Sequence, residues 1–433
     1  MKHISIIGGG LAGSEAAYQL AKRGFTVTIY EMRPLKTTPA HSTDKLGELV
    51  CSNSFRSSQM TNAAGVLKEE LKLMDSLIMH AAEKSRLDAG GALAVDREMF
   101  SSVITETLEN MDNVSITRRE ITTIPNGPTI IASGPLSSSK FSEALQSFLS
   151  DDALHFFDAV APIVTKDSID MNVCYYKNRY ETTGEGDYIN CPMDKEAYDA
   201  FYEYMMKGEG VMVREFEKNV FEGCMPVESM AQRGKDTLRF GPMKPVGLER
   251  DETHKPYAVI QLRKDDARET MYNLVGFQTQ LKFGEQKRLI QMIPGLENAE
   301  IVRYGVMHKN SFIKAPKHLY ATYQTKTRDD VYIAGQLSGV EGYVESTGSG
   351  LVAAVNMARQ LQNESPAIFP VETILGAQAD YLANANAENF QPMNANFGLV
   401  PPLEGKHRKK DRKRLYGERA IAALQRFKEA FNE

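Results

Sequence analysis

The chain has 433 residues, of which 42% are hydrophobic and 25% charged, and its formal net charge at pH 7 is -5. This composition is typical of a globular protein and excludes a globally basic nucleic-acid binder, so any RNA-binding surface has to be local. The length exceeds the roughly 250–300 residues at which single hydrophobic cores stop growing, which predicts two domains. We expect a cytoplasmic protein, because no run approaches the ~18 apolar residues of a membrane-spanning helix and no signal peptide is recognisable.

The first thirty residues predict a compact βαβ unit. Residues 3–7 are largely apolar and β-branched, residues 14–23 have a helical pattern that ends before Gly24, and residues 26–30 predict a second strand. Glu31 stands at the end of that second strand. This order of elements is typical of the start of a doubly wound α/β domain with a mainly parallel sheet.

The turn of this unit carries a G-x-G-x-x-G motif at Gly8, Gly10 and Gly13. The first glycine permits the tight turn, the second lets the backbone approach a pyrophosphate, and the third lets helix and strand pack closely. The helix N-terminus faces the anion, and Glu31 would accept hydrogen bonds from an adenosine ribose. A purely structural glycine turn is the alternative, but strand, helix, second strand and acid stand in the order that a dinucleotide site requires.

The elements that follow extend the same sheet. Apolar residues recur at helical spacing over residues 67–84, and residues 97–110 predict a further amphipathic helix. Strands are predicted at residues 114–116 and 129–132, the second ending in a Ser-Gly-Pro turn. The return from helix to strand indicates that the parallel sheet is still being built here.

The middle of the chain has a different character, with many tyrosines and several turn signals before proline. Residues 257–262 predict a strand, and Asp194 is placed to cap a helix whose aromatic and methionine stripe is typical of a core face. We interpret this part as a mixed α+β domain inserted into the first. The predicted division is residues 1–157 for the first part of the cofactor domain, 158–294 for the insertion and 295–433 for the closing part.

A late strand, residues 331–334, is followed by Gly335, Gln336, Gly342 and Tyr343 and then by a helix rich in small residues. This second strand, turn and helix start resembles the segment with which two-dinucleotide flavoproteins hold the ribitol and pyrophosphate, although Gln336 stands where Asp is more common. The segment therefore favours FAD over NAD. A second turn without a ligand is the alternative, and it would leave the run of glycines unexplained.

The four cysteines are Cys51, Cys174, Cys191 and Cys224, and none forms a C-x-x-C pair. Their wide spacing makes a structural zinc site improbable, and we expect no metal. Core packing is the ordinary role of such cysteines in a reducing compartment. From the residues alone, Cys51 at an apolar-to-polar change and Cys224 in a turn-like setting between acidic residues leave packing and chemistry both open.

Several segments together resemble one family along essentially the whole chain. They are Gly-Gly-Gly-Leu-Ala-Gly at 8–13 with Glu31 and Arg33, and the segments 47–57, 188–193, 221–228, 241–248 and 334–346. The family is that of the methylenetetrahydrofolate–tRNA-(uracil-5-)-methyltransferases, the FADH2-oxidizing kind. The larger FAD protein that modifies the wobble uridine with a partner GTPase shares the glycine motifs but lacks this cysteine pattern. The resemblance implies a glutathione-reductase-like FAD domain, with cofactor contacts at Gly8, Gly9, Gly10, Leu11, Ala12, Gly13, Glu31, Arg33, Gly335, Gln336, Gly342 and Tyr343.

The same resemblance implies that the inserted domain forms the substrate and RNA side, that Cys224 is the nucleophile and that Cys51 is a second catalytic cysteine near the flavin. The chemistry explains why a thiol is needed, since C5 of uracil becomes nucleophilic only after a thiolate adds to C6. A free thiol, with a pKa near ~8.5, is only slightly ionised at pH 7, so the site must assist ionisation or proton transfer. Cys51 or a water would remove the C5 proton. Tyr343 is a candidate for stacking on flavin or folate, with simple packing as the alternative.

The implied reaction is methylation of uridine 54 in the tRNA T-loop to 5-methyluridine, a step of tRNA processing. The carbon comes from 5,10-methylenetetrahydrofolate, FADH2 supplies the hydride and NAD(P)H restores the reduced flavin, with NADH or NADPH left open. The same chemistry on a ribosomal RNA uridine is an alternative. Two others are a small-molecule flavin oxidoreductase and a non-catalytic RNA-binding protein stabilised by FAD.

A basic run near the C-terminus is the candidate RNA-binding segment on this acidic chain. Its candidate phosphate-binding residues are Arg408, Lys409, Lys410, Arg412, Lys413 and Arg414. Several phosphate contacts would make RNA affinity strongly salt-dependent, whereas a merely solvated face is the alternative. The target base must also leave its stack to reach a nucleophile.

Overall fold

The computed structural model describes residues 3–38, 40–150, 154–159, 161–179, 186–210, 225–251, 255–266, 269–305 and 307–431. The first domain is built on a five-stranded parallel sheet of order β16-β7-β1-β2-β6. Its strands are β1 (His3–Ile7), β2 (Thr26–Glu31), β6 (Val114–Arg118), β7 (Thr129–Ile131) and β16 (Val331–Ile333). Their isoleucines and valines are almost all buried, as is typical of the strands of a parallel sheet. The predicted Rossmann-type fold is confirmed.

Two helices meet over this sheet, α1 (Leu11–Lys22) and α11 (Tyr343–Leu361). They cross closely, since a Cβ added at Gly350 would lie 2.2 Å from the carbonyl oxygen of Ala12. α1 begins directly after β1, and α11 begins ten residues after β16, beyond the 3₁₀ turn Gln336–Ser338. This crossing brings the N-termini of both helices to the carboxyl edge of the sheet, where ligands bind in open α/β folds.

The helical pattern over residues 67–84 predicts one continuous helix, whereas the structure has two helices there. They are α2 (Ala63–Leu73) and α3 (Leu77–Lys84). The break lies at Asp75, whose φ of 55° is left-handed, and at Ser76, whose hydroxyl accepts the Met79 N–H as an N-cap. Apolar spacing alone did not reveal the break because both helices present their apolar faces to the same core.

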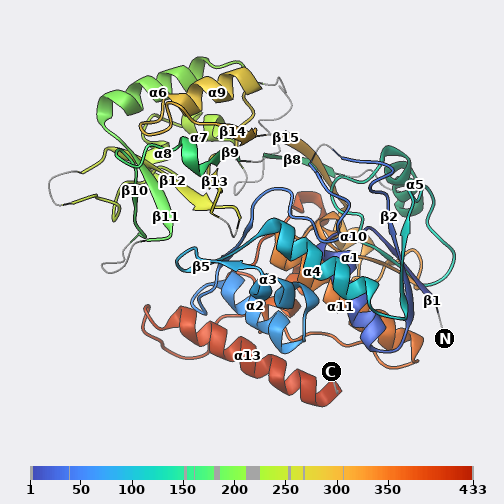
Figure 1. Ribbon diagram of the computed structural model, residues 1–433. Coiled ribbons are helices and arrows are strands. Elements are labelled where there is room, and N and C mark those ends of the chain that lie inside the picture. The colour runs from blue at the N-terminus through green and yellow to red at the C-terminus, as the bar shows by residue number, and fades with distance from the viewer. Residues whose placement is uncertain are drawn as a thin grey trace.

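The remaining elements of the first domain flank this core. A small antiparallel sheet of order β3-β5-β4 is followed by α4, and four further helices complete the domain. Their bounds are β3 (Ser54–Ser57), β4 (Arg86–Leu87), β5 (Ala92–Val95), α4 (Arg97–Glu109), α5 (Ser139–Leu149), α10 (Ala315–His318), α12 (Ile374–Asn384) and α13 (Arg412–Phe431). α13 lies along the outside of the domain against α2 (Figure 1).

A six-stranded sheet of order β10-β11-β12-β13-β9-β14 forms the centre of the second part, and all its strand pairs are antiparallel. Its strands are β9 (Ile163–Thr165), β10 (Tyr175–Tyr176), β11 (Tyr188–Met193), β12 (Ala258–Lys264), β13 (Met271–Leu274) and β14 (Ile301–Arg303). Four helices pack with it, namely α6 (Lys195–Lys207), α7 (Val227–Gln232), α8 (Thr237–Phe240) and α9 (Phe283–Gln291). α6 and α9 lie over the side of the sheet away from the first domain (Figure 1).

Two antiparallel strands, β8 (Leu154–Ala159) and β15 (Met307–Phe312), pair at the passage from one part to the other (Figure 1). Each part has its own cluster of buried apolar side chains. The helix expected after Asp194 is α6. The Asp194 carboxylate caps it by accepting the Ala197 N–H at 2.8 Å. Tyr198, Phe201 and Met205 of the predicted stripe are buried and Tyr202 is partly buried, which confirms their packing role, whereas Met206 is exposed and the prediction is wrong for it.

Within the described ranges, no helix has the length and apolar character that crossing a bilayer requires. The described residues also contain no group of three or more His, Cys, Asp or Glu side chains placed to hold a metal ion.

Candidate functional site

A cleft opens at the carboxyl ends of β1, β2 and β7, where the sequence predicts a dinucleotide. Most of the predicted cofactor residues line it: Gly8, Gly10, Leu11, Ala12, Glu31, Arg33, Gly335, Gln336 and Tyr343. Gly9 and Gly13 do not line it, and Gly342 lines a second, neighbouring cleft instead. The structure therefore gathers both glycine-rich segments, more than 300 residues apart in the chain, around one cavity.

The glycine turn has the geometry that a pyrophosphate needs. Gly8 has a φ of 101°, and a Cβ there would lie 2.5 Å from the carbonyl oxygen of Ala132. A Cβ at Gly13 would lie 1.9 Å from the carbonyl oxygen of Gly8, so helix and strand approach as closely as backbone allows. A Cβ at Gly10, by contrast, would meet nothing within 4 Å. Gly10 thus leaves open space at the helix N-terminus, where an anion is stabilised.

Glu31 ends β2 with its carboxylate held in place. Its Oε2 accepts the Gly9 N–H at 2.9 Å, and its Oε1 accepts the backbone N–H and Nε–H of Arg33 at 3.0 and 3.1 Å. Burial would raise the pKa of Glu31, but the charge and hydrogen bonds of Arg33 outweigh it and lower the pKa below its ordinary value. The carboxylate is therefore ionised at neutral pH, and a carboxylate has about four acceptor positions, which leaves capacity for a ribose hydroxyl.

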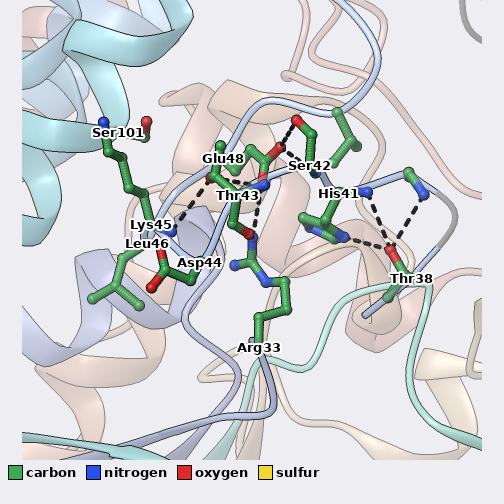
Figure 2. A network of polar contacts seen from close by, with 12 residues as sticks. Arg33, Thr38, His41, Ser42, Thr43, Asp44, Lys45, Leu46, Glu48 and Ser101 are labelled. Carbon is green, nitrogen blue, oxygen red and sulfur yellow. Dashed lines mark hydrogen bonds and ion pairs between the residues drawn. The ribbon is translucent and has the colours of Figure 1, made fainter. Parts of the chain in front are cut away.

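Arg33 extends this arrangement to a loop that sequence reasoning missed. Its Nη1 donates to Glu48 Oε2 at 2.7 Å, and Glu48 also accepts from the backbone and hydroxyls of Ser42 and Thr43 at 2.8–3.2 Å (Figure 2). Thr38, His41 and Glu48 line the cleft. The loop is thereby folded around the carboxylate of Glu48, whose side chain is 9% exposed. No local motif indicates this arrangement, because its partner Arg33 belongs to another segment.

The late segment completes the same cleft. Gly335 has a φ of 76° and follows β16, and its N–H donates to Ser349 Oγ at 2.7 Å. The side chain of Gln336 donates to Glu341 Oε2 at 2.7 Å. These contacts fix the turn between β16 and α11 next to the glycine turn of β1. The residues that are present fit a dinucleotide held between two helix N-termini.

A second cleft adjoins the first and is lined by residues of both parts of the molecule. Cys51 and Arg56 line it from one side, and Arg263, Asn273 and Gln278 line it from the other. Cys51 is partly exposed, whereas Cys174 and Cys191 are buried with their sulfur atoms 3.4 Å apart. Cys174 and Cys191 are therefore core-packing residues, whereas Cys51 lines a cavity.

Tyr343 joins the two clefts because it lines both, as Val50, Gln336 and Ser346 also do. Its hydroxyl oxygen accepts the backbone N–H of Cys51 at 2.8 Å and that of Ser52 at 3.0 Å. Burial, followed by the proximity of Cys51, raises the pKa of Tyr343 above its ordinary value, so the phenol is neutral. The Tyr343 hydroxyl therefore holds the backbone of the cysteine segment. The sequence suggested stacking on flavin or folate for Tyr343 and did not predict this role.

Cys224 lies outside the described residues, but the chain directly after it is described. The Val227 N–H donates to the Gln278 carbonyl at 2.7 Å, and Glu228 Oε1 accepts from the Thr279 hydroxyl. Burial raises the pKa of Glu228 to about 7. Because Gln278 lines the second cleft, the start of α7 is tied to the wall of that cleft.

The six basic residues of the candidate RNA-binding segment are all exposed, at the start of α13 and just before it. Arg414 forms ion pairs with Glu418 at 2.6 Å and Asp411 at 3.8 Å. Its charge is partly compensated.

Comparisons with known proteins agree with this architecture. The model of the family "Glucose inhibited division protein A" matches residues 3–365. The chain is 58% identical over 427 residues, 98% of both chains, to methylenetetrahydrofolate–tRNA-(uracil-5-)-methyltransferases of Bacillus cereus (strain G9842) and Bacillus mycoides (strain KBAB4).

Two crystal forms of GidA from Aquifex aeolicus have TM-scores of 0.74 and 0.71 at 17% and 16% identity. They cover 99% and 98% of this chain, which covers 73% and 75% of theirs, and at such identity the likeness shows the fold alone. The family model and the close relatives together identify the chain: it belongs to the glucose inhibited division protein A family and, within it, to the methylenetetrahydrofolate–tRNA-(uracil-5-)-methyltransferases.

Proposed function

We propose that this chain methylates C5 of uridine 54 in the T-loop of tRNA, with carbon from 5,10-methylenetetrahydrofolate, reduction by FADH2 and regeneration by NAD(P)H. The observation that carries the proposal is the junction of the two clefts. Tyr343 lines the dinucleotide cleft and also binds the backbone of Cys51 in the second cleft. A cofactor in one cleft and a base in the other would meet at this helix end.

The first cleft would hold FAD. Gly8, Gly10 and the N-terminus of α1 would receive the pyrophosphate, Glu31 the adenosine ribose, and the turn at Gly335 and Gln336 the ribitol side. When bound and reduced, FAD would supply the hydride that converts a methylene on C5 into a methyl group.

The cysteines would act on the base. The thiolate of Cys224 would add to C6 of uracil, and the ring electrons would make C5 the nucleophile that attacks the folate-derived methylene. The C5 proton would then leave to Cys51 or to water, and the bond between the methylene carbon and the folate nitrogen would break to release tetrahydrofolate and leave a methylene on C5. Addition of the hydride to this methylene would give the methyl group, and expulsion of the Cys224 sulfur from C6 would restore the ring. Tyr343 keeps Cys51 at the cleft by binding its backbone N–H. The RNA would be held partly by residues 408–414, and we propose a cytoplasmic location, where tRNA is processed.

The experiment is transfer of labelled carbon from methylenetetrahydrofolate to unmodified tRNA and rRNA transcripts, with FAD and either NADH or NADPH. We expect tRNA to be labelled, and a transcript with uridine 54 replaced by cytidine to remain unlabelled. Cys224→Ala and Cys51→Ala should abolish transfer, whereas the matched control Cys174→Ala, at a buried cysteine, should retain it. Labelling of rRNA alone would show that the substrate is an rRNA uridine. If FAD-loaded protein labels neither RNA, the small-molecule oxidoreductase would be favoured.

A further inference from the structure

The segment that carries Cys51 is held by polar contacts from both parts of the molecule. Arg97, at the start of α4, donates from Nη1 to the Leu49 carbonyl at 2.6 Å. Arg303, in β14 of the other part, donates from Nη2 to the Val50 carbonyl at 2.9 Å. Both guanidinium groups lie close enough to Cys51 to interact with it electrostatically. The backbone on the N-terminal side of the cysteine is thus anchored twice.

The C-terminal side of the cysteine is anchored by Arg263 of β12. Its Nη2 donates to Ser52 Oγ at 2.8 Å, and its Nε donates to Asn53 Oδ1 at 3.0 Å. Asn273 lies opposite Arg263 in the ladder of β12 and β13 and approaches Nη2 with its Oδ1 at 3.4 Å. The two planar donors of one guanidinium therefore reach two consecutive residues that follow Cys51, a geometry that an ammonium group cannot reproduce.

Asn53 makes this contact rigid. It is 0% exposed, and its Oδ1 accepts from Arg263 and from Asn273 Nδ2, the latter at 3.1 Å. Its Nδ2 donates to the Val95 carbonyl at 3.1 Å and the Lys264 carbonyl at 2.8 Å. All four hydrogen-bonding positions of the amide are used, so the side chain joins β5 of one part to β12 of the other.

Burying Arg263 is unfavourable in itself. Its acceptors on Ser52, Asn53 and Asn273 are a hydroxyl and two amides, all neutral. Burial lowers the pKa of the Arg263 guanidinium below its ordinary value, despite the opposing effects of Tyr188, which also hydrogen-bonds to it, and of Asp265. Because its hydrogen-bond acceptors are neutral, ion pairing does not explain the burial of this cation, whereas its fixed hydrogen bonds to Ser52 and Asn53 point to a geometric role. Both residues directly follow Cys51 in the chain, so these hydrogen bonds would set the position of Cys51.

We propose that Arg263 is a positioning residue that sets the Cys51 segment in its reactive geometry through Ser52 and Asn53, and so makes that geometry depend on the docking of the inserted sheet. The inference rests on the proposed function for its kinetic consequence. Its structural consequence, the accessibility of Cys51, can be measured without any RNA or folate.

The test compares Arg263→Gln and Arg263→Lys with wild type in the FAD-loaded protein. Alkylation of Cys51 by iodoacetamide is followed by mass spectrometry of its peptide, together with flavin content and the kcat and KM for tRNA. We expect Arg263→Gln to change the alkylation rate of Cys51 several-fold and to lower kcat on the order of 100-fold, because misplacement of about 1 Å has that effect, with KM for tRNA nearly unchanged. Arg263→Lys should recover only part of kcat, since it restores the charge but not the fork.

The matched control is Arg239→Gln in the same sheet domain. Arg239 donates to the Tyr257 carbonyl at 2.9 Å and pairs with Asp236 at 2.7 Å, away from the cysteine segment. It should lose stability without altering Cys51 alkylation. If Arg263→Gln folds poorly, Ser52→Ala, which removes only one acceptor, should give the same change on a smaller scale.

Equal Cys51 alkylation in wild type, Arg263→Gln and Ser52→Ala would overturn the proposal. So would an alkylation change in Arg239→Gln as large as that in Arg263→Gln, since the effect would then follow general stability. If wild type methylates no RNA, the proposed function fails, but a changed alkylation rate would still support the positioning role.

Discussion

Replacing Gly13 or Gly10 of the β1–α1 turn by alanine should have different effects: Gly13→Ala should lower the free energy of unfolding, and Gly10→Ala should weaken FAD binding. Gly13 is the packing glycine, because its added Cβ would lie 1.9 Å from the Gly8 carbonyl oxygen. An ordinary C···O contact is about 3.3–3.6 Å, so α1 would have to move by more than about 1 Å. It cannot retreat easily, since α11 crosses it at Gly350 with equally little room. Overpacking of this kind costs about 1–3 kcal/mol of unfolding free energy.

Gly10 should behave in the opposite way. Its φ of -74° suits any residue, and its Cβ would meet no protein atom within 4 Å. Replacement by alanine should therefore leave the apoprotein as stable as wild type or raise stability by about 0.4–1 kcal/mol through the unfolded chain. The methyl group would instead stand where the pyrophosphate approaches. Loss of one charge-assisted hydrogen bond, about 1.5–3 kcal/mol, would weaken FAD binding by roughly 10- to 150-fold.

The assay pairs urea unfolding of the apoproteins, followed by circular dichroism, with FAD titration followed by flavin fluorescence. Gly284→Ala is the control, because Gly284 lies in α9 and its Cβ also meets open space, far from the turn in the chain. It should bind FAD normally and unfold no earlier than wild type. Wild-type FAD affinity in Gly10→Ala would show that no pyrophosphate lies at this turn, and unchanged unfolding of Gly13→Ala would refute the close packing.

Three further outcomes follow from the site. Glu31→Gln should weaken FAD binding by about 10- to 100-fold in a fluorescence titration, because a charged acceptor of the ribose becomes neutral; unchanged affinity would remove Glu31 from the site. Glu228 has its pKa raised from 4.5 to about 7 by burial, so the native state binds more protons than the unfolded state between these values, and stability falls as pH rises through that window. Urea unfolding at pH 5 and pH 8 should show wild type losing stability relative to Glu228→Gln, and parallel curves would contradict the shift. Replacing Lys409 and Lys410 by Glu should lower tRNA affinity and reduce the salt slope by about 0.9 per lost phosphate contact, whereas an unchanged slope in filter binding would make the segment a solvated face.

The sequence was sufficient for the cofactor fold because its signals are local. The βαβ unit, the glycine turn and Glu31 all lie within residues 3–31, and the structure contains each of them, although α1 begins at Leu11, three residues before its predicted start. The turn at Gly335 was found for the same reason. The break between α2 and α3 was missed because one residue with a left-handed backbone, Asp75, interrupts an apolar pattern that continues unchanged on both sides.

The second cleft was harder to predict because its walls come from segments more than 200 residues apart. Arg263 is a charged residue in a strand, and a pattern-based interpretation would place it in solvent, yet it is 8% exposed and faces Asn53 of the other part. Likewise, Glu48 has no motif of its own and becomes recognisable only once Arg33 is seen beside it. The sequence spacing of polar residues does not reveal their role when the side chain that binds them belongs to another segment.

The shared wall of the two clefts constrains how the proposed chemistry can be perturbed. Val50, Gln336, Tyr343 and Ser346 belong to both linings, so a change there affects the dinucleotide cleft and the cysteine segment together. Gly10 lines only the first cleft and Arg263 only the second. The effects of substitutions at Gly10 and Arg263 on FAD affinity and on the rate of Cys51 alkylation should therefore be additive in the double variant. Tyr343→Phe removes the hydroxyl that binds the Cys51 and Ser52 amides. Its effects should not be additive with those of either substitution. Additivity with Tyr343→Phe as well would mean that the two clefts work independently, and that the junction does not carry the transfer.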